Sequence, residues 1–527
     1  MATANAAYPI VDPVSFQGQI NNFWKNQESV DKPWLLCFLA VLALGYQLPV
    51  DDINDEPIAG GQRRGKQLMT FVSNVLVSSS ELGSRPTAPV MQTLLCMCVA
   101  HKLRIDWVDG NDTMSGLLGL AHRLVSTMGL HRDPYLAGSM LPKYAMAHYQ
   151  AVSRRRLFLT VNLLDVEHSL DAGMPYHLRT CDYDHINESE YDRMSSYERS
   201  LVVALPSWSA YLNSILSSRS SPPNDANAAS ILKLATQHTD DAVAISDYRS
   251  GDHDAMANAL QTAILRTLDH RLLLTYYSGR LLHGPKATTV ETQQSMLKSV
   301  RAIMANQKIL YDLADRYGPA ARATWHHLFS SIFRCSGGYT AATILMMLRA
   351  TISDDMSQRN ALPPGETVTG LVAELDNYFL FAVKAIPYSL EIIKEIMAWS
   401  ALQKSISLRL EICARKGWAT FSTTSPLVQD VMRGMAEAMD DMLVKARRAI
   451  DEARRSSDPP PALLELTQAE VEADRNGKQT AGTGFDPSVL EGEALDAWTR
   501  ETDALLKDLD LQWPYPLPLG DGSDWIF

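Results

Sequence analysis

The chain has 527 residues, of which 46% are hydrophobic and 20% are charged, and this composition excludes a chain that is disordered throughout. Its 60 acidic residues outnumber 48 basic ones and give a formal net charge of −12. That charge has the wrong sign for a protein that holds DNA by neutralising phosphates. We therefore expect any contact of these residues with DNA to be indirect, through a partner.

The longest apolar run covers residues 34–46, WLLCFLAVLALGY. It is shorter than the ~20 residues that a membrane-spanning helix needs, so it predicts a buried core helix and no membrane association. The first residues, MATANAAYPIVDPVSFQGQ, lack the basic region and apolar stretch of a secretory signal. These features predict a protein that stays inside the cell.

Along the chain, apolar residues recur mainly at intervals of three and four, which predicts an all-α fold. Polar segments rich in Pro, Gly and Ser separate the predicted helices, and no internal repeat indicates a solenoid. We expect an N-terminal extension over residues 1–30 and one large multi-helix regulatory domain over residues 31–455. The predicted helices cover residues 31–48, 67–80, 88–106, 114–129, 141–172, 194–216, 226–247, 253–282, 288–317, 320–351, 366–416 (at least two helices) and 426–456.

The end of the chain has a different composition. Residues 456–484 begin SSDPPP and predict a linker, and residues 485–527 form an acidic, aromatic and partly disordered tail. Such a mixture is typical of an activation segment that folds onto a coactivator groove. The alternative, which we favour because exposed aromatic side chains are costly, is that the tail packs against the chain's own helices. The residues that would make either contact are Trp498, Leu509, Trp513, Trp525 and Phe527.

The cysteines, histidines and acids of the chain do not form a metal or catalytic motif. The six cysteines, at positions 37, 96, 98, 181, 335 and 413, are scattered, whereas a binuclear zinc cluster needs paired cysteines in one short basic segment. His326 and His327 are adjacent and so face different sides of a helix. His131-Arg132-Asp133 matches the start of a kinase catalytic loop, but Gly138 stands where that loop needs Asn. The sequence therefore predicts no cofactor, no metal ligand, no catalytic residue and no enzyme.

A more specific pattern lies between residues 117 and 184. An apolar helical face ends at Gly129, where a left-handed residue would stop the helix. The sequence then reads Leu130-His131-Arg132-Asp133-Pro134. Further on, Arg154-Arg155-Arg156 opens an apolar helix that contains Asp165, and that helix ends near Gly173-Met174-Pro175 before an acid-rich loop.

This order of motifs resembles the middle homology region of fungal zinc-cluster (Zn2Cys6-type) transcription factors, also described as the xylanolytic-activator regulatory domain. YYSGRLLHGP at residues 276–285, and Cys335 with Ala341-Ala342, are weaker points of similarity. The resemblance covers about residues 30–420. It implies a nuclear regulator, shuttling from the cytoplasm, that binds protein partners of the transcription machinery, receives a small-molecule effector and forms a homodimer. It also implies control of a metabolic or specialised-metabolite gene cluster.

Asp165 shares a helical face with Arg154, Phe158 and Val161. An ionised carboxylate on that face needs a cation or several donors. We expect Asp165 to be partly buried and paired with Arg132 or with one of Arg154, Arg155 and Arg156. An active site would need more polar groups than a single pair, so these motif residues are predicted to be structural.

The absence of a zinc cluster from these 527 residues leaves two interpretations. The chain is a cofactor recruited by a DNA-bound protein, or the gene model has lost an N-terminal exon. A rival from another class is a small-molecule-binding or catalytic protein of a biosynthetic pathway that is derived from the regulator scaffold. Substrate turnover by the purified chain would favour this rival.

Overall fold

The computed structural model describes most of the chain before residue 456. The described residues are 2–26, 30–48, 58–78, 86–103, 110–132, 148–174, 176–177, 194–216, 225–242, 253–283, 289–351, 362–386, 392–416 and 426–455. The predicted linker and the tail residues Trp498, Leu509, Trp513, Trp525 and Phe527 lie outside them. Both interpretations of the tail therefore stay predictions.

Within the described residues the structure consists of fifteen α-helices and contains no strand, which confirms the predicted all-α class. None of these helices is both long enough and apolar enough to cross a membrane. The helices are α1 (Ala2–Ala7), α2 (Pro13–Lys25), α3 (Lys32–Gln47), α4 (Ile58–Ser78), α6 (Ala88–Lys102), α7 (Gly110–Thr127), α9 (His148–Ala172), α10 (Ser196–Leu216), α11 (Asp225–Ala242), α12 (His253–His283), α13 (Thr289–Ala314), α14 (Pro319–Thr351), α15 (Val368–Ala385), α16 (Ile392–Lys416) and α17 (Pro426–Arg455).

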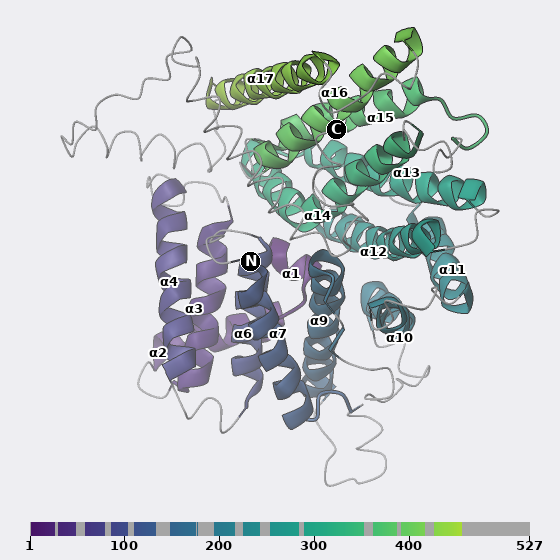
Figure 1. The fold of residues 1–527 in the computed structure, drawn as a ribbon. Coiled ribbons are helices and arrows are strands. Elements are labelled where there is room, and N and C mark those ends of the chain that lie inside the picture. The colour runs from purple at the N-terminus through teal and green to yellow at the C-terminus, as the bar shows by residue number, and fades with distance from the viewer. Residues whose placement is uncertain are drawn as a thin grey trace.

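The helices form two groups that meet at α1 and α9 (Figure 1). On one side, α3 packs between α4 and α6, and α7 packs against both α6 and α9. On the other side, α10 to α14 pack largely in chain order, and α15 and α16 lie on α14 with α17 along α16. Helix α9 also contacts α10 and α12. Side chains that α9 presents to its neighbours can therefore link the two groups.

The apolar run at residues 34–46 lies inside α3, as predicted. Leu36, Cys37, Ala40 and Leu44 are buried there. Cys96 and Cys98, which α6 carries, are both fully buried, and burial raises the pKa of the Cys98 thiol to about 12. These thiols are therefore apolar core groups rather than reactive thiolates.

The first residues of the chain differ from the expected extension. Helix α1 packs against α12 and α14, and Tyr8 directly after it is completely buried. Gln261 Nε2 donates to the carbonyl oxygen of Ala6 at 2.7 Å, and Tyr197 donates to that of Ala7 at 3.1 Å. The sequence did not predict α1 because six residues are too few to show a helical period.

A buried histidine on α12 gives the fold a dependence on pH. His270 is only 7% exposed. Burial, followed by the positive charges of Arg266 and Lys298, lowers its pKa from 6.5 to about 4. The unfolded chain takes up this proton near its ordinary pKa and the folded chain does not. The stability that the neutral form of His270 contributes is therefore fully present above its ordinary pKa of 6.5. It is lost as the pH falls towards the folded pKa.

Replacing this histidine is expected to reduce the acid sensitivity of the protein. The wild-type free energy of unfolding should fall by about 1–2 kcal/mol between pH 7 and pH 5 because of this group, and His270→Gln should remove that part of the fall. Lys298→Gln should remove only a small part, because burial is the largest cause of the shift. Urea unfolding at both pH values measures the difference. An equal fall in wild type and His270→Gln would contradict the assignment.

Candidate functional site

The Gly129 motif ends α7 as the sequence predicts. Gly129 has a φ of 63°, and its N–H donates to Ser126 O at 3.1 Å while the N–H of Leu130 donates to Val125 O at 2.9 Å. This pair of bonds is a Schellman motif. Arg154, at the start of α9, donates to the carbonyl oxygens of Met128 at 2.8 Å and Gly129 at 3.1 Å. Arg154 therefore caps the C-terminus of α7 with a positive charge.

Because of this turn, one glycine of the motif should resist substitution while a nearby glycine should not. Gly129→Ala is expected to destabilise the protein by about 1–2 kcal/mol, since an L side chain is strained in the left-handed region. Gly116 lies in α7, and a Cβ there would meet no atom within 4 Å, so Gly116→Ala should instead stabilise by about 0.5–1 kcal/mol. Thermal or urea unfolding of the two variants checks the opposite signs. Two changes of the same sign would be inconsistent with this role for Gly129.

The other motif residues have separate positions. Arg155 is buried, whereas Arg156 pairs with Glu198 at 2.5 Å and with Asp12 at 3.4 Å. His131 and Arg132 follow the turn, the first partly exposed and the second exposed. Gly173, with a φ of 64°, follows the end of α9. Asp133 and Pro175 lie outside the described residues.

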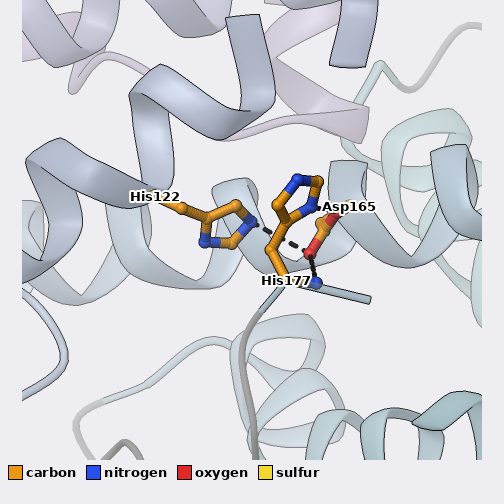
Figure 2. A group of neighbouring side chains, drawn as sticks. All are labelled: His122, Asp165 and His177. Atoms are coloured by element: carbon orange, nitrogen blue, oxygen red, sulfur yellow. Dashed lines mark hydrogen bonds and ion pairs between the residues drawn. The ribbon is translucent and has the colours of Figure 1, made fainter. Parts of the chain in front are cut away.

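Asp165 lies at the centre of a small polar cluster (Figure 2). Its carboxylate is completely buried, and Oδ1 lies 2.7 Å from His177 Nδ1. Its Oδ2 accepts a hydrogen bond of 2.9 Å from the backbone N–H of His177 and lies 2.9 Å from His122 Nε2. His122 belongs to α7, and His177 belongs to the segment that follows α9. Three separate parts of the chain therefore meet at one carboxylate.

The predicted arginine partner of Asp165 was wrong. Arg154 precedes Asp165 by three helical turns, about 16 Å along the axis of α9, and it reaches the end of α7 instead. Arg132 is exposed. The helical face was correct, but a shared face does not bring together residues three turns apart. Asp165 is instead paired with histidines that the sequence places in other elements.

Contacts with both histidines keep Asp165 ionised. Burial raises the pKa of Asp165, but His122 and His177 outweigh it and bring the value down to about 2. The hydrogen bond to Asp165 raises the pKa of His177. The two imidazole rings stack with their centroids 5.1 Å apart. The His177 side chain is 35% exposed and the other two are nearly or fully buried, so the cluster meets solvent at His177.

The cluster has the donor atoms of a metal site. His122, Asp165 and His177 each offer one ligand atom, and these atoms lie within 4.8 Å of one another. Of the described residues, this is the group of His, Cys, Asp and Glu side chains that could hold an ion. The sequence predicted no metal ligand, because none of the three residues stands at a ligand spacing from another on one helix.

A serine–histidine pair lies near the cluster. Ser115 Oγ of α7 is 2.8 Å from His168 Nε2 of α9, an arrangement that a nucleophile and its base can adopt. Burial lowers the pKa of His168. The described hydrogen bonds include no carboxylate that orients the other ring nitrogen of His168. The pair therefore carries no catalytic assignment.

A second buried network links the two groups of helices. Glu167 accepts a hydrogen bond from the Tyr8 hydroxyl at 2.9 Å and pairs with Lys102 Nζ at 3.1 Å. One turn further along α9, Asp171 pairs with Arg271 of α12 and lies 3.6 Å from Lys102 Nζ. Burial raises the pKa of Glu167, while Arg271 and Lys102 overcome burial and lower that of Asp171. Two cations therefore balance one buried and one partly buried carboxylate between α6, α9 and α12.

A third buried group joins α10, α11 and α12. Asp269 accepts a hydrogen bond from Trp208 Nε1 at 2.8 Å and lies 2.5 Å from His238 Nδ1. All three side chains are almost completely buried. Burial raises the pKa of Asp269 despite these partners. The contacts hold three helices together, so they explain packing rather than chemistry.

Comparisons with known proteins agree with the resemblance seen in the motifs. Residues 3–238 match the family model "Fungal specific transcription factor domain". The chain is 24% identical over 297 residues to "Transcription factor lepE" of Aspergillus flavus, which is 54% of this chain and 34% of that protein. It is 26% identical over 192 residues to "Transcription factor asR3" of Sarocladium schorii, which is 36% of this chain and 21% of that protein. No solved structure matches the chain. The chain therefore aligns with about a third or less of either relative's length.

Proposed function

We propose that this chain is a nuclear regulator of fungal transcription that acts through its helical domain, because residues 3–238 match the model of the fungal specific transcription factor domain. The family match is the observation that carries the proposal. Both relatives are named as transcription factors. The matched residues run from α1 through α11 and contain the Gly129 turn, the three arginines and Asp165.

The helices beyond residue 238 act with the matched part. Helix α12 packs against α1, α9 and α10, and Arg271 of α12 pairs with Asp171 of α9 inside the matched residues. A movement of α12 would therefore alter the contacts of α9. We propose that these later helices belong to the same regulatory domain and transmit the signal of an effector or a protein partner to it.

Contact with DNA runs through a partner protein in this proposal. The net charge of −12 over these residues supports it, because non-specific affinity for DNA comes from neutralising phosphates. Titration of the 527-residue chain with promoter DNA at physiological salt tests the point. Specific binding by the chain alone, with submicromolar affinity, would overturn the indirect route.

A reporter assay tests the regulatory role itself. The whole chain is fused to a foreign DNA-binding domain, and expression of a reporter gene is compared with that domain alone. We expect a change of several-fold, an increase if the chain activates and a decrease if it represses. Arg271→Leu in the fusion should weaken this change in reporter expression, because it removes the ion pair between α12 and α9. An unchanged reporter with a fusion of normal abundance would contradict the proposal.

A further inference from the structure

We propose that His122, Asp165 and His177 bind a divalent transition-metal ion, and that Zn²⁺ fits the three residues best. The ion would join the end of α7, the middle of α9 and the segment after α9 at a single point. This binding does not depend on the transcriptional role. It would instead give the helical domain a metal-dependent state.

The donor set matches the chemistry of zinc. Zn²⁺ takes imidazole nitrogens and carboxylate oxygens at about 2.0–2.2 Å, and sites with three protein ligands leave a fourth position to water or another group. Two imidazoles and one carboxylate are what His122, His177 and Asp165 supply. Hard ions such as Mg²⁺ and Ca²⁺ prefer oxygen ligands, so two nitrogens favour a transition metal.

His122 gives further support because its ring is buried and one ring nitrogen has no hydrogen-bond partner among the described residues. The side chain is 8% exposed, and Nε2 lies 2.9 Å from Asp165 Oδ2. The other ring nitrogen, Nδ1, has no hydrogen-bond partner among the described residues. Leaving a buried polar atom unsatisfied costs about 1–3 kcal/mol. Binding of an ion to this imidazole, in the neutral form that metal ligation requires, would help to offset that cost.

The cluster needs only a small adjustment to hold the ion. Its nitrogen–oxygen distances are now 2.7 and 2.9 Å, whereas tetrahedral ligands at zinc bond lengths lie about 3.3 Å apart. His122 and Asp165 are held by packed helices. His177 is 35% exposed and lies beyond the helix end at Gly173, so it can move outwards by this amount. Its exposure also admits water to the fourth position.

The opposing interpretation is that the three residues pair directly with one another and bind no ion. Both interpretations explain how the negative charge of Asp165 is compensated. They differ in what happens when a metal is offered to the protein. Direct pairing predicts no saturable binding of zinc, whereas a metal site predicts one ion per chain.

A titration of the full chain distinguishes the two. The purified protein is freed of metal with a chelator, and Zn²⁺ alone is added in a calorimeter. We expect saturation near one equivalent, and about 100-fold weaker binding for His122→Gln and for His177→Gln, since each removes a ligand. His168→Gln is the matched control, because His168 lies on α9 close to Asp165 but bonds Ser115. It should bind zinc as the wild type does.

A second measurement guards against variants that fold poorly. Bound Co²⁺ in a four-coordinate site should give a visible absorption band in the wild type and in His168→Gln, and no band in His177→Gln. Zn²⁺ should also raise the Tm of the wild type but not that of His177→Gln. Absence of stoichiometric binding by the wild type would overturn the proposal, and so would an unchanged affinity in both ligand variants. The reporter assay involves no added metal, so its outcome is separate.

Discussion

Arg271→Leu should destabilise the protein by about 3 kcal/mol, because it removes the buried partner of Asp171 and leaves the charge of that carboxylate poorly compensated. Arg271 is 6% exposed at its side chain and pairs with Asp171, which is 20% exposed. It also donates to the carbonyl oxygen of Leu170 at 3.1 Å. Lys102 Nζ stays 3.6 Å from Asp171, which places the expected loss at the lower end of the range for such pairs.

The same substitution at an exposed arginine provides the matched control. Arg301 pairs with Glu366 at 2.8 Å and with Glu374 at 2.5 Å, but its side chain is 44% exposed. Arg301→Leu should therefore cost about 1 kcal/mol or less. Adding Asp171→Asn to Arg271→Leu should restore part of the lost stability, since the orphaned charge is gone. Urea unfolding gives the values. Equal losses for the two arginine variants would contradict the role given to the buried pair.

The sequence predicted the parts of this fold that depend on local patterns. Residues 34–46 are apolar on all sides, and most of them are buried or partly buried in α3, although Leu42 and Tyr46 are exposed. Gly129 follows an apolar face directly, and it adopts the left-handed conformation that ends α7. A helical period and a helix stop signal both depend on a few neighbouring residues. The all-α class therefore follows from the sequence alone.

The polar contacts could not be predicted in this way. Asp165 was assigned an arginine partner because arginines lie on its own face, whereas its partners come from α7 and from the segment after α9. Likewise, nothing near Tyr8 in the sequence points to Glu167. Such contacts depend on how helices that are distant in the sequence pack together. The periodicity of a single sequence does not indicate which helices these are. The candidate metal ligands were missed for this reason.

Trp208→Ala should cause the largest loss of stability among the core substitutions considered, about 4 kcal/mol or more. Trp208 on α10 is completely buried, and truncating such a side chain creates a cavity that costs about 3–5 kcal/mol. The variant also removes the Nε1–H that donates to Asp269 at 2.8 Å. Asp269 is then left with His238 as its remaining described hydrogen-bond partner, which adds a desolvation cost.

Two further variants separate these contributions. Trp208→Phe keeps most of the bulk and loses the donor, so it should cost about 2 kcal/mol. Trp24→Ala is the control for removing an indole, because Trp24 is 63% exposed and its loss should change stability by about 0.5 kcal/mol or less. Thermal or urea unfolding of the three variants gives the order. If Trp208→Phe were as stable as the wild type, the hydrogen bond from Trp208 to Asp269 would contribute nothing to stability.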